Sequence, residues 1–272
     1  MRNIPDDNLA YPVLLKFDTG SSGSSFMLRT TDKQFLITAK HVLFDINNVL
    51  RGKIIELIAQ TIDINDETTT NFSVDLSKVK IISHPSADIS AIELGTVIED
   101  EKINGCQTTY YDGVIITRTG NSKIVCAQAK ESTKLLKDVL ISNNIFLYGY
   151  PTSLGLKNSP QFNYNKPLMR TGIIANTNPQ LGTIILDCPV YYGNSGGPVV
   201  EVDQDGLTRN HKIIGVVSQF IPFVEEWINS KSQLIQHAEY SNSGYSVAVA
   251  IDKVLELILA PVESPERRLA AK

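Results

Sequence analysis

The sequence predicts an all-β protein built as a barrel or a sandwich. Short runs of β-branched and other apolar residues recur along the chain, and Gly, Asn, Asp and Ser separate them as turns separate strands. Apolar residues make up 42% of the 272 residues and charged residues 20%. Wholesale disorder is therefore not expected, and the chain can bury one large core or two moderate ones.

The first half of the chain contains a series of apolar runs of strand length. They span residues 11–17, 24–29, 34–38, 53–59, 72–75, 79–83 and 89–94. We interpret residues 20–25, Gly-Ser-Ser-Gly-Ser-Ser, as a flexible turn between the first two strands. Residues 65–71, rich in Thr, Asp and Asn, are expected to form an exposed loop, and a connector of low hydrophobicity at 99–105 to separate the two halves.

The second half continues the same pattern. Further strands are expected at residues 113–119, 123–129, 145–150, 170–175, 183–186, 198–202, 212–220 and 245–250. Residues 131–141 have helical spacing and predict a short helix or an irregular insertion. The polar stretch 152–167 is too long for a tight turn, and we interpret it as a surface loop near the functional site.

Two helices are expected near the C-terminal end. Residues 223–236 can be helical and would form an insertion before the last strand. Asp252 is the expected N-cap of an apolar helix at 253–259, and residues 261–272 are expected to be a frayed tail.

Charge and cysteine content narrow the class of protein. The net charge is −4 and the chain has no long Lys/Arg run, so nucleic acid is not expected as its main ligand. The N-terminal residues lack the apolar core of a signal peptide, and no apolar run approaches the length that crosses a bilayer, so no membrane partner is expected. Cys106, Cys126 and Cys188 cannot all pair within one chain, and we expect three ordinary buried thiols in a reducing, cytoplasmic compartment.

One glycine-dense stretch carries the strongest functional signal. Gly193-Asn194-Ser195-Gly196-Gly197-Pro198 is a polar turn between two apolar runs. Backbone N–H groups around Gly193, Asn194 and Ser195 can turn toward one point, which is how an oxyanion hole is built around a nucleophilic serine. A plain tight turn would need only one glycine, or Asn-Gly.

A nucleophilic serine also needs a base, and the base needs an acid to orient it. His41 stands where an apolar strand ends, anchored but able to face a cleft, whereas a lone histidine there would more often be structural. Asp88 opens the largely apolar run 89–94, so its carboxylate needs a partner, although an Asx-type turn cap is an equal alternative when Asp88 is taken alone.

Together these segments resemble a known enzyme family. Thr38-Ala39-Lys40-His41, Asp88-Ile89-Ser90-Ala91-Ile92 and the Gly193–Pro198 turn follow one another in the order His, Asp, Ser. The sequence resembles the chymotrypsin/trypsin-like serine proteases over about residues 10–260, in the style of HtrA-type and other bacterial-like members.

The resemblance implies one protease domain made of two six-stranded antiparallel β-barrels. The first barrel would span about residues 10–100 and the second about 106–250, followed by a C-terminal helix at 252–260 and a tail. It further implies that His41, Asp88 and Ser195 form a catalytic triad for peptide hydrolysis through an acyl-enzyme, with the site in the cleft between the barrels.

The chain departs from its relatives in regulation. Digestive relatives carry an aspartate where Asn194 stands, and no Ile-Val-Gly-Gly-like activation site occurs, so activation by cleavage is not expected. The enzyme would be constitutively competent or ordered by another signal. The paired cysteines of secreted relatives are missing, and the chain ends too soon after its last helix to hold the PDZ domain of typical HtrA proteases.

The specificity pocket also departs from trypsin. Pro189 stands six residues before the serine, where trypsin-like enzymes carry Asp, and Val190 follows it. Ser218-Gln219-Phe220 matches the strand that pairs with the substrate backbone and walls the pocket, and Phe220 replaces a common glycine. We therefore expect a narrowed pocket for a small or medium apolar P1 residue.

Other functions are compatible with the same sequence. A catalytically silent binding module could keep the same fold, and an esterase or other acyl-transfer enzyme could use the same site. The protease could also be a regulated effector or quality-control enzyme inside the cell, with a regulatory protein docked on residues 223–236. No cofactor or metal is expected, because His41, His84, His211 and His237 show no ligand spacing and no phosphate-binding glycine loop follows a strand.

Overall fold

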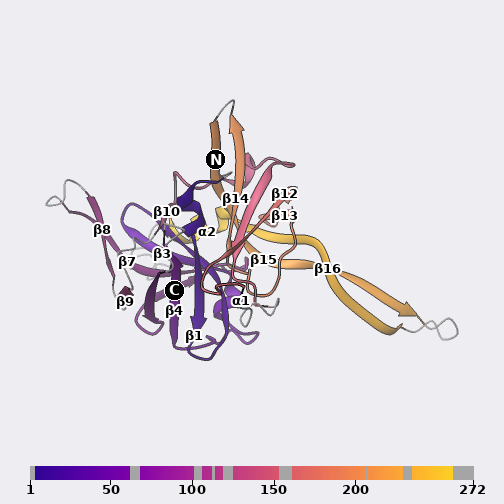
Figure 1. The fold of residues 1–272 in the computed structure, drawn as a ribbon, viewed down its shortest axis with the longest axis horizontal. Helices are drawn as coiled ribbons and strands as arrows, with labels where there is room; N and C mark the ends of the chain where they lie inside the picture. The colour runs from indigo at the N-terminus through magenta and orange to yellow at the C-terminus, as the bar shows by residue number, and fades with distance from the viewer. Residues whose placement is uncertain are drawn as a thin grey trace, which may run out of the picture.

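The structure is a computed structural model that describes residues 4–61, 68–100, 106–111, 114–118, 125–152, 161–205, 208–228 and 235–259. It is a double β-barrel with a C-terminal helix, as the sequence predicts (Figure 1). Within the described part of the chain, no helix is both long enough and apolar enough to cross a membrane.

The first sheet is curled and contains ten strands. Along its main path the order is β6-β7-β3-β2-β1-β4-β5-β9, while β8 pairs with β7 and β10 lies parallel to β2. The strands are β1 (Pro12–Phe17), β2 (Ser22–Arg29), β3 (Lys33–Thr38), β4 (Ile54–Gln60), β5 (Thr69–Asp75), β6 (Lys80–Ser83), β7 (Ser90–Asp100), β8 (Cys106–Tyr111), β9 (Val114–Arg118) and β10 (Ala127–Gln128). The short helix α1 (Lys40–Leu43) follows β3, and the 3₁₀ turn η1 (Asp6–Ala10) precedes β1.

The second sheet is a closed six-stranded barrel. Its order is β11-β12-β13-β16-β15-β14, and all of its pairings are antiparallel. The strands are β11 (Asn144–Gly149), β12 (Leu168–Asn178), β13 (Thr183–Asp187), β14 (Pro198–Asp205), β15 (Thr208–Ile228) and β16 (Ile235–Ala250). Between the sheets runs an irregular segment with the 3₁₀ turn η3 (Leu136–Asp138), which is the irregular insertion expected at 131–141.

Three of the four apolar clusters among the described residues form most of the core. One fills the first sheet around Leu15, Leu36 and Leu57, and another fills the closed barrel around Leu147, Leu186 and Val199; all six of these side chains are fully buried. The third lies where the two sheets meet the C-terminal helix α2 (Ile251–Ile258), and its members are Phe26, Leu28, Phe35, Tyr148, Val200, Val216, Ile251 and Val254 among others. The helix therefore closes the joint between the two sheets.

The division between the sheets differs from the expected one. β7 continues to Asp100 and pairs with β8, which the sequence analysis did not predict, and β9 and β10 also join the first sheet. The sheets therefore divide between Gln128 and Asn144, and not near residue 106. Of the connector expected at 99–105, Glu99 and Asp100 belong to β7, and residues 101–105 lie outside the described ranges.

Several local expectations need correction. Only Gly20 and Ser21 of the turn expected at 20–25 lie between β1 and β2, because Ser22–Arg29 is strand β2 and both Ser24 and Ser25 are fully buried. Strand β5 begins at Thr69, so the end of the expected 65–71 loop is strand, while residues 62–67 lie outside the described ranges. Ala250, and not Asp252, is the N-cap of α2. The described residues of 152–167 contain no strand or helix, and the tail at 261–272 is not described.

The largest correction concerns the helix expected at 223–236: residues 223–228 and 235–236 are strand, and residues 229–234 lie outside the described ranges. β15 and β16 continue past the barrel as a two-stranded ribbon that extends far from the body of the molecule (Figure 1). Both faces of this ribbon are exposed, so its sequence lacks the alternation of apolar and polar residues that marks a half-buried strand. The spacing of the apolar residues in this stretch therefore resembled that of a helix and led to the wrong prediction.

Candidate active site

The turn that carries Ser195 connects β13 to β14 and requires its glycines. Gly193 has φ of 96° and Gly196 φ of 87°, a backbone region that side-chain-bearing residues rarely adopt. A Cβ on Gly193 would collide with the Tyr150 carbonyl, and one on Gly196 with the Ser24 carbonyl. Gly196 N–H donates to the Val217 carbonyl at 2.8 Å, which fixes the turn against β15.

Ser24 in β2 holds this turn from the other sheet. Its N–H donates to the Ser195 carbonyl at 3.0 Å, and its Oγ donates to the Gly193 carbonyl at 2.6 Å. The same Oγ accepts the Tyr150 N–H at 2.9 Å. The sequence analysis missed this residue, because nothing in a run of Gly and Ser distinguishes a buried hydrogen-bonding serine from a flexible turn.

His41 and Asp88 form the hydrogen-bonded pair that the sequence predicts. His41 lies in α1 directly after β3, and its Nδ1 is 2.7 Å from Asp88 Oδ2. Asp88 Oδ1 also accepts the His41 backbone N–H at 3.0 Å, and the Ser218 hydroxyl donates to Oδ2 at 2.6 Å. The Asx-turn alternative for Asp88 is thus not needed to explain its position.

The electrostatics of Asp88 favour its ionised form. Burial opposes ionisation, but the hydrogen bond and the charge of His41, together with the Ser218 hydroxyl, outweigh it and hold the pKa of Asp88 below its ordinary value. A negatively charged Asp88 accepts a hydrogen bond from the protonated Nδ1 of His41. In the neutral ring, Nε2 is then the nitrogen that can accept a proton.

Ser195 and His41 are not hydrogen-bonded to each other. The Ser195 hydroxyl donates to the Ser218 carbonyl at 3.0 Å. Ser218 is therefore hydrogen-bonded to two of the three proposed site residues: its hydroxyl donates to Asp88, and its carbonyl accepts from Ser195. The Ser195 hydroxyl must release the Ser218 carbonyl before its proton can pass to His41.

The backbone N–H groups of Gly193 and Ser195 are available to a ligand. The Tyr192 carbonyl accepts the Thr152 N–H at 2.8 Å, and the Asn194 carbonyl accepts the Gly197 N–H at 3.0 Å. Because a trans peptide directs its N–H away from its own carbonyl, these contacts leave Gly193 and Ser195 N–H without a partner among the described residues. Asn194 does not share this role, because its N–H donates to the Tyr191 carbonyl at 3.0 Å.

The residues expected to shape specificity lie beside this turn. Val190 is buried, and its carbonyl accepts the Asn242 side-chain amide at 2.6 Å; Pro189 precedes it and is half-buried. Phe220 meets the exposed ring of Tyr192 edge-on, with 6.0 Å between the ring centroids, and Gln219 is exposed. Tyr192, which the sequence analysis did not single out, thus stands with Phe220 at this edge of the site.

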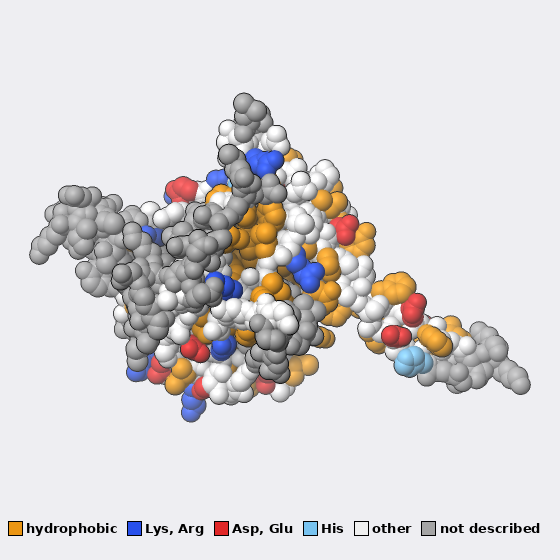
Figure 2. Space-filling view, viewed as in Figure 1, with side chains coloured by type: hydrophobic (Ala, Val, Ile, Leu, Met, Phe, Trp, Pro, Cys, Tyr) orange, Lys and Arg blue, Asp and Glu red, His pale blue; other side chains and the backbone are white. Residues whose placement is uncertain are grey.

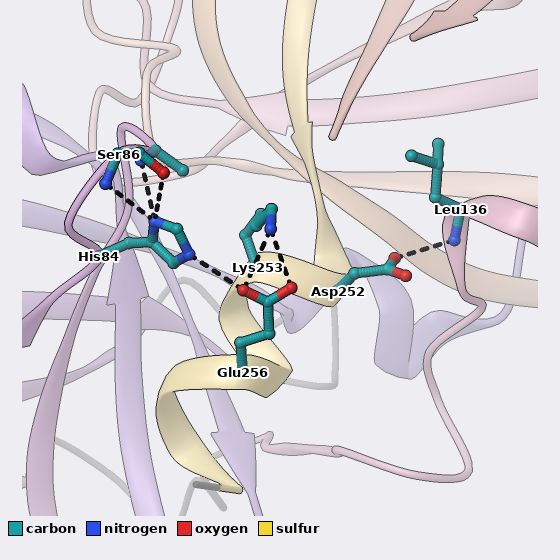
Figure 3. A network of polar contacts seen from close by, with 7 residues as sticks. His84, Ser86, Leu136, Asp252, Lys253 and Glu256 are labelled. Carbon is teal, nitrogen blue, oxygen red and sulfur yellow. Dashed lines mark hydrogen bonds and ion pairs between the residues drawn. The ribbon is translucent and has the colours of Figure 1, made fainter. Parts of the chain in front are cut away.

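His84 ties the Asp88 turn to the C-terminal helix (Figure 3). Its Nδ1 accepts the Ala87 N–H at 2.9 Å and the Ser86 N–H at 3.2 Å, and its Nε2 lies 3.1 Å from Glu256 Oε2 on α2. His84 is buried.

The remaining polar chemistry is limited. Burial raises the pKa of Cys126 to about 12 and that of Cys188 to about 11, so both free thiols stay protonated near neutral pH, while the Cys106 side chain is not described. Among the described residues, no group of three or more His, Cys, Asp or Glu side chains is placed to hold a metal ion.

Comparison with known proteins identifies the fold. No protein-family model matches the sequence, and no curated protein sequence matches it. Among solved structures, the chain is similar to "HtrA-type protease AlgW with tripeptide", with a TM-score of 0.50 and 18% identity over 94% of this chain and 61% of that one. The chain thus spans about three fifths of the length of that protein, and the similarity is one of fold.

Proposed function

We propose that this chain is a serine endopeptidase that uses Ser195 as nucleophile, His41 as general base and acid, and Asp88 as the group that orients His41. The observation that carries the proposal is the His41–Asp88 pair, with 2.7 Å between Nδ1 and Oδ2, next to a serine in a turn fixed by glycines. Among the described residues, neither the N–H of this serine nor that of Gly193 has a partner. The similarity of fold to an HtrA-type protease supports a hydrolase of this kind.

In the proposed reaction, Ser195 Oγ attacks the carbonyl carbon of a peptide bond while His41 Nε2 takes the hydroxyl proton. The carbonyl oxygen becomes an oxyanion, and the Gly193 and Ser195 N–H groups donate to it, each worth about 2.7–4 kcal/mol in comparable enzymes. His41 returns the proton to the leaving amine as the C–N bond breaks. Water, activated by His41, then hydrolyses the acyl-enzyme and frees Ser195.

The proposed P1 preference is for small or medium apolar side chains. Pro189 and Val190 offer no charge to pair with a Lys or Arg side chain, and the Tyr192–Phe220 ring pair occupies space beside the turn. A peptide-library profile dominated by Arg or Lys at P1 would overturn this preference without touching the proposed chemistry.

The test of the chemistry is covalent labelling by a fluorophosphonate. We expect the wild type to label and Ser195→Ala to fail to label, with peptide hydrolysis lost in the same variant. Asp88→Asn should slow both reactions strongly, because His41 loses the acceptor that fixes its tautomer. Labelling of Ser195→Ala at the wild-type rate would refute the assignment.

A second candidate is a catalytically silent binding module with the protease fold. The observation in its favour is the Ser195 hydroxyl, which donates to the Ser218 carbonyl and not to His41. A wild type that never labels, even after prolonged incubation with peptides, would favour this candidate. Labelling that begins only when a peptide or protein partner is added would favour a regulated protease.

The proposal places this protease inside the cell, as a regulated effector or a quality-control enzyme acting on protein or peptide substrates. The unpaired cysteines are consistent with a reducing compartment. Asn194 supports activation by a route other than N-terminal cleavage, because its buried side chain accepts the Tyr191 N–H at 3.0 Å and presents no charge to a new amino terminus.

A further inference from the structure

The second barrel carries a ribbon that none of the proposed chemistry uses. Residues 219–228 of β15 and 235–245 of β16, here called the arm, leave the barrel and project into solvent (Figures 1 and 2). Two-stranded ribbons are marginal on their own in water. A bound partner would therefore stabilise a ribbon of this length.

One edge of the arm continues directly from the active site. β15 pairs with β14 as far as Val216, and with β16 on its other edge as far as Ile228. After Val217, β14 no longer pairs with β15, and no other described strand takes its place along that edge of β15. This open edge starts at Ser218, whose carbonyl holds the Ser195 hydroxyl, and runs outward to Ile228.

The arm is acidic and partly aromatic. Glu225 faces Glu239 directly across the two strands, a like-charge pair that destabilises a ribbon. The same face carries Phe223 and Trp227, which are 52% and 62% exposed. No Lys or Arg occurs among the described arm residues, so nothing in that range neutralises the two carboxylates.

The direction of a bound substrate follows from the proposed chemistry. His41 must reach the leaving amine, so the chain on the C-terminal side of the scissile bond lies toward His41 and the first sheet. The N-terminal side then runs the opposite way, along the edge of β15. A peptide that adds a strand to an open edge gains main-chain hydrogen bonds, and neighbouring side chains select its sequence.

We propose that the arm is an extended subsite for the N-terminal part of the substrate, and that it selects basic residues interspersed with apolar ones. With one substrate residue opposite each β15 residue and P1 opposite Ser218, Glu225 lies opposite a substrate residue about seven positions upstream of P1, roughly 23 Å away. This inference rests on the proposed peptidase activity and deepens it.

A Lys or Arg at that place would relieve the Glu225–Glu239 repulsion. Apolar residues two positions before and two positions after it point to the same face and would cover Phe223 and Trp227. Because the carboxylates are exposed, the attraction is screened by salt, and it should fade as ionic strength rises.

The test compares three peptides that share one cleavable eight-residue core. The first extends the core, which is cleaved at its centre, on its N-terminal side with Leu-Ser-Lys-Ser-Leu-Ser, so that Lys and Leu share one face of the added strand. The second has Glu in place of that Lys, and the third carries the Lys–Leu extension on its C-terminal side. We expect kcat/KM for the first peptide to exceed that of the other two by about three- to tenfold at low salt and to approach them in 0.5 M salt.

Two variants assign the effect to one face of the arm. The double variant Glu225→Gln/Glu239→Gln should lose the preference for the Lys–Leu peptide while cleaving the unextended core at the wild-type rate. Glu226→Gln is the matched control, because it removes a charge from the opposite face, where Glu226 lies across from Ala238. It should keep the preference.

The outcomes separate the two proposals. If the core is cleaved but the N-terminal extension makes no difference, or if the double variant keeps the preference, the arm subsite is wrong and the peptidase stands. A preference for the C-terminal extension also overturns the subsite. If Ser195 neither labels nor cleaves the core, the peptidase is wrong and the substrate role of the arm falls with it.

Discussion

Ser24 and Ser25 are adjacent, fully buried serines with different duties. Ser24 Oγ binds the Gly193 carbonyl and the Tyr150 N–H, both in the second half of the fold, whereas Ser25 Oγ donates to the Val13 carbonyl at 2.9 Å within the first sheet. Only Ser24 touches the turn whose N–H groups would hold the oxyanion.

This contrast predicts a split between activity and stability. Ser24→Ala and Ser25→Ala should each lower the free energy of unfolding by about 1–3 kcal/mol, because each removes a buried hydrogen-bonding hydroxyl. Only Ser24→Ala should also lower kcat/KM, by tenfold or more, since the Gly193 carbonyl loses its anchor. Urea denaturation and peptide hydrolysis measure the two quantities; equal loss of activity in both variants would contradict this role for Ser24.

At the scale of elements, α2 connects parts of the molecule that lie far apart in sequence (Figure 3). Glu256 binds His84 in the Asp88 turn, and Asp252 Oδ2 accepts the Leu136 N–H at 2.8 Å in the segment between the sheets. Lys253 is hydrogen-bonded to Glu256 and, with His84, lowers the pKa of that carboxyl. The helix thus joins the turn that carries Asp88 to the entry of the second barrel.

Glu256→Ala is expected to destabilise the protein by about 1–3 kcal/mol, because the buried His84 ring nitrogen loses its partner. Lys253→Ala on the same helix removes only an exposed ion pair and should cost at most about 0.5 kcal/mol. Chemical denaturation of both variants measures the difference. Equal costs would show that the His84–Glu256 contact contributes nothing beyond a surface charge pair.

The three residues proposed as a triad could be selected from the sequence because each of them sits in a local sequence pattern. Ser195 is surrounded by glycines, His41 ends an apolar strand and Asp88 begins another, so short windows of sequence marked all three. Ser24, the Ser218 hydroxyl and the His84–Glu256 contact were not predictable, because their importance comes from residues more than 100 positions away.

The predictions for the arm and for the division between the two sheets were wrong for a different reason. A ribbon exposed on both faces has no buried side to impose alternation, so the sequence of residues 223–228 did not distinguish strand from helix. The boundary between the sheets depends on which strands pair, and β9 joins the first sheet only through its long-range pairing with β5. Strand propensity alone does not specify partners.

At the scale of the whole molecule, the candidate site is assembled across the joint between the two sheets. His41 and Asp88 come from the first sheet and its connections, and Ser195 and Ser218 from the second barrel. The bond from Ser218 Oγ to Asp88 Oδ2 is one of the contacts that crosses this joint, at 2.6 Å. It should therefore link the stability of the joint to the charge of Asp88.

The sign of this linkage follows from the direction of the Asp88 shift. A carboxyl whose folded pKa is depressed contributes stability above its unfolded pKa, about 3.9, and loses it as the pH falls through the folded pKa. Ser218→Ala removes one of the groups that depress the pKa, so it should cost about 1.5 kcal/mol at pH 7 and progressively less below pH 4.

Ser246→Ala is the matched control for this pH dependence. Its hydroxyl is also buried but donates to the Cys188 carbonyl at 2.8 Å, a group that does not titrate. The cost of Ser246→Ala in urea denaturation should therefore stay constant between pH 7 and pH 3, while that of Ser218→Ala shrinks. If the cost in unfolding free energy has the same pH dependence in both variants, the Ser218 hydroxyl only packs at the joint, and His41 alone stabilises the charge of Asp88.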